Sequence, residues 1–188
     1  CGLRRGGGEG WGVWCGERGV AGLAVVAAAA ESALKEACGG PVRGPGAVVA
    51  GGTPADLRKC QGGTLVDDTY NANPGSVRAA IAWLAGRPSP RTLVLGAMGE
   101  LGPSAETLVT ELGANARAAG IDTLITLPGA EAAARGFGDS AEPVENFDQA
   151  AERAAGTLAQ GGTVLVKGSR SARMEQVVQR LTDKGRGH

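Results

Sequence analysis

After Gly62, short apolar runs alternate with segments of helical periodicity, and this alternation limits the fold more than any other feature of the sequence. The apolar runs predict strands at residues 64–67, 91–95, 122–127, 143–145 and 163–167. The segments between and after them predict helices at residues 74–85, 104–119, 129–135, 148–159 and 171–181. Strands and helices that alternate in this way form βαβ units, whose right-handed crossovers place helices on both faces of the sheet. The sequence therefore predicts an α/β fold with a doubly wound, mainly parallel sheet.

The residues before this region have a different character. Residues 1–19 are rich in glycine and show neither helical nor strand periodicity, and residues 39–63 are interrupted by Gly-Gly, Gly-Pro and Thr-Pro pairs. Between them, Val20–Ala37 predicts an Ala-rich helix that a Gly-Gly pair would close. We expect a domain at residues 62–188, preceded by an irregular and partly helical segment at residues 1–61.

Charge and hydropathy argue against two classes of partner. The chain has 19 basic and 19 acidic residues, so no overall field attracts nucleic acid or an anionic membrane. The apolar run Val20–Ala30 is too short to span a bilayer, although with Arg18 before it the run also imitates the core of a signal peptide. We favour a buried helix, and we expect neither a nucleic-acid partner nor membrane insertion.

The cysteines and the histidine do not form a metal-binding pattern. All four cysteines lie in the first segment, without a Cys-x-x-Cys pair: Cys1, Cys15, Cys38 and Cys60. The only histidine is His188. This pattern argues against a zinc site and against a disulfide framework. We therefore expect unpaired thiols in a cytoplasmic protein, with no metal site.

The first of three polar motifs follows the first predicted strand and reads Asp-Asp-Thr-Tyr-Asn-Ala-Asn-Pro from Asp67. Asn73 and Pro74 suit the N-cap and the first position of a helix, so a capped turn explains part of the motif. An amide and a carboxylate at a strand end can also hydrogen-bond a ribose or a base, and a tyrosine can cover an aromatic ring. The motif predicts either a capped turn alone or a nucleotide site formed by Asp68, Tyr70, Asn71 and Asn73.

The second motif, Leu-Gly-Ala-Met-Gly-Glu-Leu-Gly-Pro at residues 95–103, has three glycines that allow a ligand to approach the backbone closely. It is neither a dinucleotide-binding Gly-x-Gly-x-x-Gly fingerprint nor a phosphate-binding P-loop. A flexible loop after a strand explains it equally well. We expect Glu100 to lie near any ligand that binds at this loop.

The third motif, Lys-Gly-Ser-Arg-Ser from Lys167, stands where the last predicted strand gives way to the last helix. Backbone N–H groups at a helix N-terminus favour an anion, and Arg170 can bind a carboxylate through two hydrogen bonds. A solvated turn with Ser171 as N-cap is the alternative. Because ligands gather at the carboxyl ends of parallel strands, we expect Tyr70 and Arg170 to open onto one shared cleft.

Together the three motifs, in this order and spacing, resemble the carboxy-terminal domain of the Mur ligases over residues 62 to about 181. The Asp-x-Tyr-Asn-Ala-Asn-Pro and Lys-Gly-Ser-Arg versions are similar to those of the branch that adds D-alanyl-D-alanine to UDP-N-acetylmuramoyl-tripeptide. The resemblance implies a Rossmann-like domain of a cytoplasmic, monomeric ligase of peptidoglycan synthesis. In such a ligase ATP activates the tripeptide carboxylate as an acyl phosphate, and the dipeptide amine then attacks it.

The resemblance also implies roles for the motif residues. The residues of the first motif, Asp68, Tyr70, Asn71 and Asn73, would bind the nucleotide, and those of the other two would bind the substrate: Glu100, Lys167, Gly168, Ser169 and Arg170. No catalytic nucleophile is expected in this chain. ATP and Mg²⁺ would be bound mainly by a central domain, because the chain contains no Gly-x-x-x-x-Gly-Lys-Ser/Thr loop.

The sequence departs from the family pattern in three places. The family's Gly-Asp-Met reads Gly-Ala-Met here, with Ala97 in place of a carboxylate, and a histidine common in the next helix is replaced near Val109. Upstream, residues 1–61 match only faintly. We interpret them as a remnant of the central ATPase domain or as a misread or disordered segment, which makes the chain an inactive fragment when alone.

Two other functions stay open at this stage. The missing P-loop also fits a non-catalytic domain that binds a nucleotide or a small anion. Another Mur-type amide ligase is a further alternative, although those relatives usually carry a histidine where Asn71, Ala72 and Asn73 stand here.

Overall fold

The computed structural model describes residues 2–5, 11–14, 47–49 and 53–184. The chain divides into two compact units, Cys1–Glu36 and Ala37–His188. In the first unit, β1 (Gly2–Arg5) and β2 (Trp11–Trp14) pair antiparallel, although residues 1–19 show no strand periodicity. A glycine-rich hairpin does not show the alternation that predicts strands. The predicted helix Val20–Ala37 lies outside the described residues.

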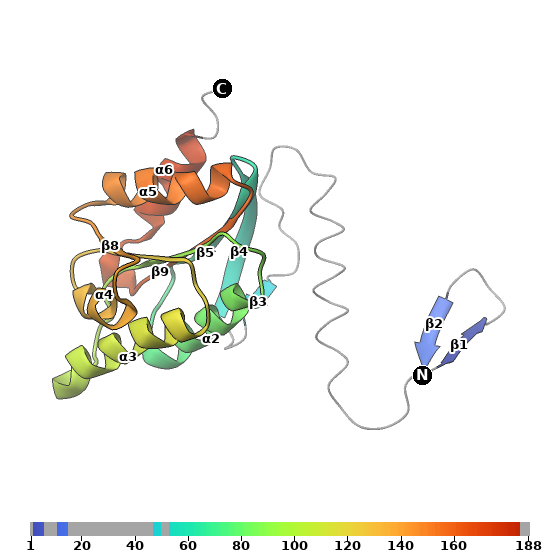
Figure 1. Cartoon of the computed structure of the whole chain (residues 1–188), viewed down its shortest axis with the longest axis horizontal. Coiled ribbons are helices and arrows are strands. Elements are labelled where there is room, and N and C mark those ends of the chain that lie inside the picture. The colour runs from blue at the N-terminus through green and yellow to red at the C-terminus, as the bar shows by residue number, and fades with distance from the viewer. Residues whose placement is uncertain (1, 6–10, 15–46, 50–52, 185–188) are drawn as a thin grey trace. The chain divides into compact units, whose positions relative to one another are not determined.

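The second unit is built on a seven-stranded sheet with the order β3-β4-β5-β9-β6-β7-β8 (Figure 1). Its strands are β3 (Ala47–Val49), β4 (Thr53–Cys60), β5 (Gly63–Asp68), β6 (Arg91–Leu95), β7 (Thr123–Thr126), β8 (Ala141–Pro143) and β9 (Thr163–Lys167). All pairs from β5 to β8 are parallel, while β3 and β4 add an antiparallel edge. The predicted α/β fold with a mainly parallel sheet is therefore confirmed.

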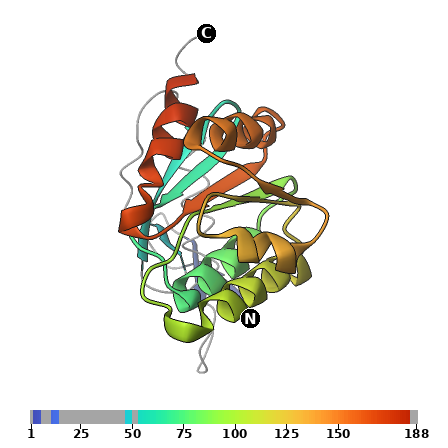
Figure 2. The ribbon, with the colours of Figure 1, turned by 90° about the vertical axis from the view of Figure 1, so that its left-hand side faces the viewer.

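Helices cover both faces of the sheet (Figure 2). One face carries α2 (Pro74–Ala85), α3 (Ala105–Ala118) and α4 (Glu131–Phe137), and the other carries α5 (Phe147–Ala159) and α6 (Glu175–Lys184). Successive residues of a strand point to opposite faces, so Leu165 packs under the first layer while Val164 and Val166 pack under the second. β9 is buried along its whole length, as a central parallel strand should be. None of the helices in the described part of the chain is long and apolar enough to cross a membrane.

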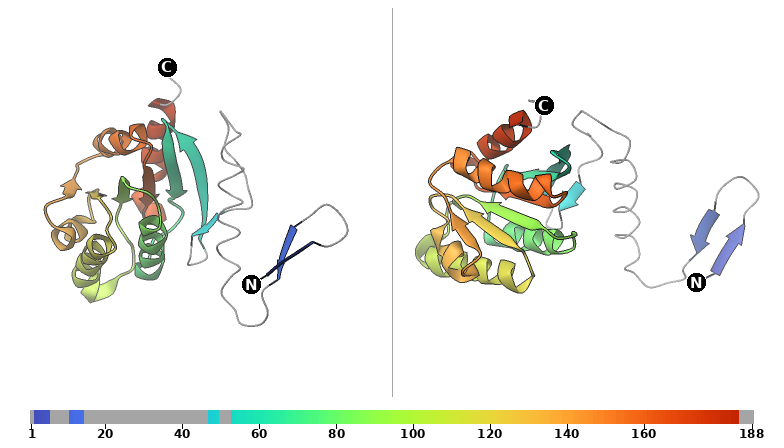
Figure 3. Two further views of the ribbon diagram at one scale, coloured as in Figure 1. Left: turned by 45° about the vertical axis from the view of Figure 1, so that its right-hand side comes forward. Right: turned by 45° about the horizontal axis from the view of Figure 1, so that its top comes forward.

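Most element boundaries differ from the predictions by one or two residues; β8, for example, lies at Ala141–Pro143 and not at residues 143–145. Two differences are larger. β4 lies before the predicted start of the domain at residue 62 and forms five residue pairs with β5, from Asp56↔Asp67 to Cys60↔Gly63 (Figure 3). The last helix begins at Glu175 and not at residue 171, because a 3₁₀ turn η2 (Arg170–Ala172) and the left-handed Arg173, with φ of 53°, come first. The turn after β9 is therefore longer than the sequence indicated.

Candidate functional site

The three polar motifs follow three neighbouring strands, β5, β9 and β6, and meet at their carboxyl ends. Asp68 at the end of β5 is paired with Lys167 at the end of β9, and Leu95 of β6 is paired with the same lysine on its other side. Beyond the strands, Gly96 N donates to Lys167 O at 2.9 Å and Ser169 N donates to Ala97 O at 2.9 Å. We call the loops 69–73, 96–101 and 168–171 together the strand-end site.

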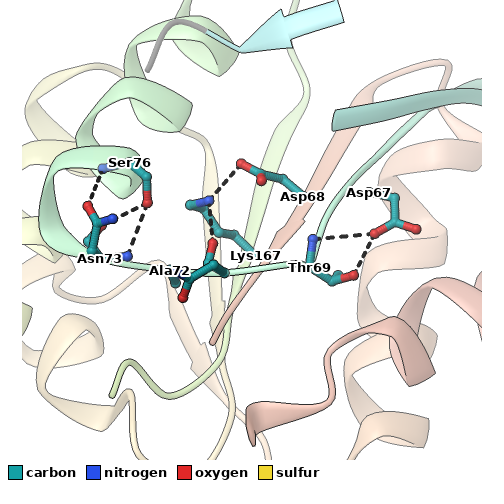
Figure 4. A network of polar contacts seen from close by, with 8 residues as sticks. Asp67, Asp68, Thr69, Ala72, Asn73, Ser76 and Lys167 are labelled. Atoms are coloured by element: carbon teal, nitrogen blue, oxygen red, sulfur yellow. Dashed lines mark hydrogen bonds and ion pairs between the residues drawn. The ribbon is translucent and has the colours of Figure 1, made fainter. Parts of the chain in front are cut away.

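A buried ion pair forms the floor of this site. Lys167 Nζ lies 2.8 Å from Asp68 Oδ2, and the two side chains are 0% and 1% exposed. The same nitrogen donates to the backbone oxygen of Asn71 at 2.9 Å (Figure 4). Asp68 Oδ1 is buried and has no hydrogen-bond partner in the described part of the chain. Burial raises the pKa of the Asp68 carboxyl above its ordinary value, and the nearby lysine opposes this effect without cancelling it.

Hydrogen bonds between residues close in sequence hold both ends of the first loop. At its start, Asp67 Oδ1 accepts from the backbone N and the hydroxyl of Thr69, at 3.3 and 2.7 Å. At its end, Asn73 Oδ1 accepts from Ser76 N at 2.9 Å, and Ser76 Oγ accepts from Asn73 N at 3.1 Å. These reciprocal bonds form a capping box at the start of α2. Asn73 is therefore a helix cap, and its amide NH₂ is the part left for a ligand.

Tyr70 and Arg170 connect the first and third motifs across the site. Tyr70 is 68% exposed, and among the described residues it is the large hydrophobic side chain that lies on the surface. The guanidinium carbon of Arg170 lies 5.7 Å from the centre of the Tyr70 ring, within the range of a cation–π contact. Asn71 is also exposed, and its Oδ1 accepts from the backbone N of Ala72 at 2.8 Å. Tyr70 and Arg170 therefore lie next to each other as predicted, and the cleft that they were expected to share stays a prediction.

Backbone packing fixes the second and third loops against each other. A Cβ at Gly96 or at Gly168 would collide with the buried side chain of Met174, so only glycine allows both loops to approach it. Glu100 is exposed and has a left-handed backbone with φ of 58°. Ser169 is buried in its turn, and its hydroxyl lies 3.0 Å from that of Ser171.

The two substituted positions of the family pattern lie in different parts of the fold. Ala97 lies in the strand-end site, where its backbone oxygen accepts from Ser169 N. Val109 is buried in the core layer of α2, α3 and α4. In the described ranges, no group of three or more His, Cys, Asp or Glu side chains could hold a metal ion.

The sequence did not indicate the role of Arg58, because β4 itself was not predicted. Its guanidinium lies 3.4 Å from Asp67 Oδ2 and 3.6 Å from Asp56 Oδ2, so it links β4 to Asp67 of β5, whose other oxygen holds Thr69 at the start of the first loop. The pairing of Asp68 with Lys167 was also not foreseen. Both residues end neighbouring strands and point to the same face, which is the signal that could have indicated it.

Comparison with known protein families gives a match to "Mur ligase, glutamate ligase domain" over residues 56–170. The UDP-N-acetylmuramoyl-tripeptide–D-alanyl-D-alanine ligase of Escherichia coli (strain K12) is 40% identical over 123 residues, 64% of this chain and 27% of that protein. The protein of the same name from Haemophilus influenzae is 37% identical over 129 residues, again 64% of this chain and 27% of that protein. The chain thus spans about 27% of the length of these curated relatives.

Solved structures give a similar result. The MurF ligase from Thermotoga maritima, solved in complex with ADP, matches with a TM-score of 0.63 and 28% identity, covering 70% of this chain and 30% of that one. A MurF structure from Acinetobacter baumannii matches with a TM-score of 0.62 and 27% identity, covering 68% of this chain and 29% of that one.

Proposed function

Because the chain belongs to the Mur ligase family, we propose that it acts as the carboxy-terminal domain of a ligase that joins D-alanyl-D-alanine to UDP-N-acetylmuramoyl-tripeptide. The observation that carries this proposal is the contact between Tyr70 and Arg170. It places a ring that can stack on a base beside a cation that can bind a carboxylate. Two reactants held at these groups would lie side by side.

The first loop supplies the nucleotide side of the proposed site. The exposed Tyr70 ring stacks on the base, and the amides of Asn71 and Asn73 offer hydrogen bonds to the base or ribose. Asp68 is buried with Lys167, so its part on this side is to hold the base of the loop beneath these groups. The similar MurF ligase solved in complex with ADP supports an adenine nucleotide as a ligand of the whole ligase.

The other two loops supply the dipeptide side. Arg170 is exposed and its planar guanidinium can bind the terminal carboxylate of D-alanyl-D-alanine through two hydrogen bonds. Ser169 and Gly168 shape the turn that presents it, and Glu100 lies on the loop that packs against this turn. A carboxylate at Glu100 suits the dipeptide's amino group.

The chemistry assigned to this chain is positioning. In the proposed reaction ATP activates the tripeptide carboxylate as an acyl phosphate, and the dipeptide amine displaces the phosphate. Holding the amine next to the activated carboxyl converts an encounter between two molecules into a step within one complex. The described residues include no group of three or more His, Cys, Asp or Glu side chains that could hold a metal ion, and in this proposal Mg²⁺ and the phosphate chain belong to a central domain.

Titration of the 188-residue chain with ADP, and separately with D-alanyl-D-alanine, tests the proposal by calorimetry. We expect both to bind, Tyr70→Leu to weaken ADP alone, and Arg170→Gln to weaken the dipeptide by about tenfold, the loss typical of a charged hydrogen bond. Arg153→Gln is the matched control, because Arg153 is an exposed arginine of α5 with Glu142 at 3.7 Å. Binding of ADP without the dipeptide would favour the second candidate, a non-catalytic domain that binds a nucleotide.

A further inference from the structure

We infer that Lys167 is a positioning residue that sets the place of Tyr70, and that it does not itself bind the dipeptide carboxylate. The inference rests on the proposed function for the role of Tyr70. Its basis is the pair of hydrogen bonds from Lys167 Nζ, to Asp68 Oδ2 at 2.8 Å and to Asn71 O at 2.9 Å. The second of these reaches the backbone immediately after Tyr70.

The burial of Lys167 argues against direct contact with a ligand. Its side chain is 0% exposed, and its nitrogen already has a carboxylate and a carbonyl as acceptors. A dipeptide carboxylate could reach it only by displacing Asp68, which would leave a buried carboxylate without its cation. Removing one partner of a buried pair is strongly unfavourable, whereas Arg170 is exposed in the same turn and requires no such exchange.

The first loop needs a support in its middle. The bonds of Asp67 to Thr69 fix its start and those of Asn73 to Ser76 fix its end. Between these ends, the hydrogen bond from Lys167 to Asn71 O ties the backbone next to Tyr70 to β9, and Ala72 after it packs into the core. The large exposed ring of Tyr70 gains little from packing, so its place depends on the backbone beneath it.

The composition of the pair also fits a positioning role better than a stabilising one. Taking two charges out of water costs more than their attraction returns unless every remaining hydrogen-bonding atom is satisfied. Asp68 Oδ1 is buried and has no partner in the described part of the chain. The best-documented role of a buried ion pair is to fix one conformation among several. Here that conformation is the one in which loop 69–73 lies over the ends of β5 and β9.

Tyr70 is the only tyrosine of the chain, so a chain labelled with 3-fluorotyrosine gives one ¹⁹F resonance that reports on this loop. The test variants are Lys167→Met and the double variant Asp68→Asn with Lys167→Met, which removes the buried charge that the single variant leaves. Lys59→Met is the matched control, because Lys59 bonds Thr64 at 3.1 Å on the exposed surface at the other end of β5.

Both Lys167 variants should move the Tyr70 resonance towards its position in the urea-unfolded chain. Exchange of the Ala72 amide, which donates to Asn71 Oδ1, should accelerate by about tenfold, as expected for loss of a charged hydrogen bond. The double variant should resist urea better than Lys167→Met does, while its Tyr70 resonance should stay displaced. If Lys167 only stabilised the fold, the resonance would return together with the stability. If Lys167→Met does not fold, the Tyr70 resonance and the amide exchange of the double variant give the same test. Lys59→Met should match the unmodified chain in every measurement.

Ligand titrations separate this inference from the proposed function. ADP affinity should fall in both Lys167 variants, while D-alanyl-D-alanine affinity should change less than that of ADP. A folded Lys167 variant that keeps the Tyr70 resonance and exchange rates would overturn the inference, and loss of dipeptide binding with an unmoved resonance would make Lys167 a direct ligand instead. If the unmodified chain binds neither ligand, the proposed function fails, and the resonance and exchange data still decide what positions Tyr70.

Discussion

Substitution of Gly113 by alanine tests the packing of α3 against α4 in quantitative terms. A Cβ at Gly113 would lie 2.7 Å from the carbonyl carbon of Ala133 and closer still to its oxygen. These atoms are backbone and cannot rotate away, so the two helices would have to separate. Alanine gains about 1 kcal/mol over glycine from helix propensity. Overpacking costs about 1–3 kcal/mol or more, and we place this case at or above the upper end because the obstacle is rigid.

We therefore expect Gly113→Ala to lower the free energy of unfolding by about 2 kcal/mol. Gly156→Ala is the matched control, since Gly156 is a glycine of α5 where an added Cβ meets nothing within 4 Å. That variant should raise the free energy of unfolding by about 1 kcal/mol. With a urea dependence of about 2 kcal/mol per molar, the two midpoints should differ by roughly 1.5 M. Equal midpoints, or a Gly113 variant as stable as the unmodified chain, would refute the close contact of the helices.

Three further predictions concern single residues. Hydrogen bonding from the backbone N–H of Gly129 lowers the pKa of Glu131 below its ordinary value. The stabilising contribution of Glu131 is therefore fully present above the ordinary pKa of a glutamate and is lost as the pH falls through the lowered one. Glu131→Gln should flatten the dependence of the unfolding free energy on pH in that acidic range. Asn73→Ala should cost about 1 kcal/mol in urea denaturation through loss of the helix cap, and Asn73→Asp should retain most of it. Gly168→Ala should cost about 1–3 kcal/mol because the buried Met174 must move, whereas Gly99→Ala, in open space, should be nearly neutral.

The parts of the fold that could be predicted are those where local signals and burial agree. α2, β6 and β9 begin and end at the predicted residues. Asn73 and Pro74 mark the start of α2 by capping chemistry, and the two strands are continuous apolar runs because helices cover both faces of the sheet. The meeting of the three motifs followed from topology alone, since parallel strands end at one edge.

The parts that could not be predicted depend on partners far away in the sequence. β4 begins with Thr-Pro and carries charged residues, and its strand conformation comes from pairing with β5. The late start of α6 depends on Arg173 adopting a left-handed conformation that few non-glycine residues favour. Lys167 was predicted as a ligand-binding cation because its sequence neighbours suggest a turn, while its burial against Asp68 is a property of the folded sheet.

The central claim is that one edge of this sheet holds a nucleotide and a dipeptide next to each other. The most direct measurement is an NMR study of the ¹⁵N-labelled chain with ADP and D-alanyl-D-alanine present together, recording contacts between ligand protons and the protein. We predict that adenine protons contact the Tyr70 ring, that dipeptide methyl groups contact residues 168–170, and that both sets persist in one sample. Contacts at unrelated surfaces, or displacement of one ligand by the other, would contradict the account.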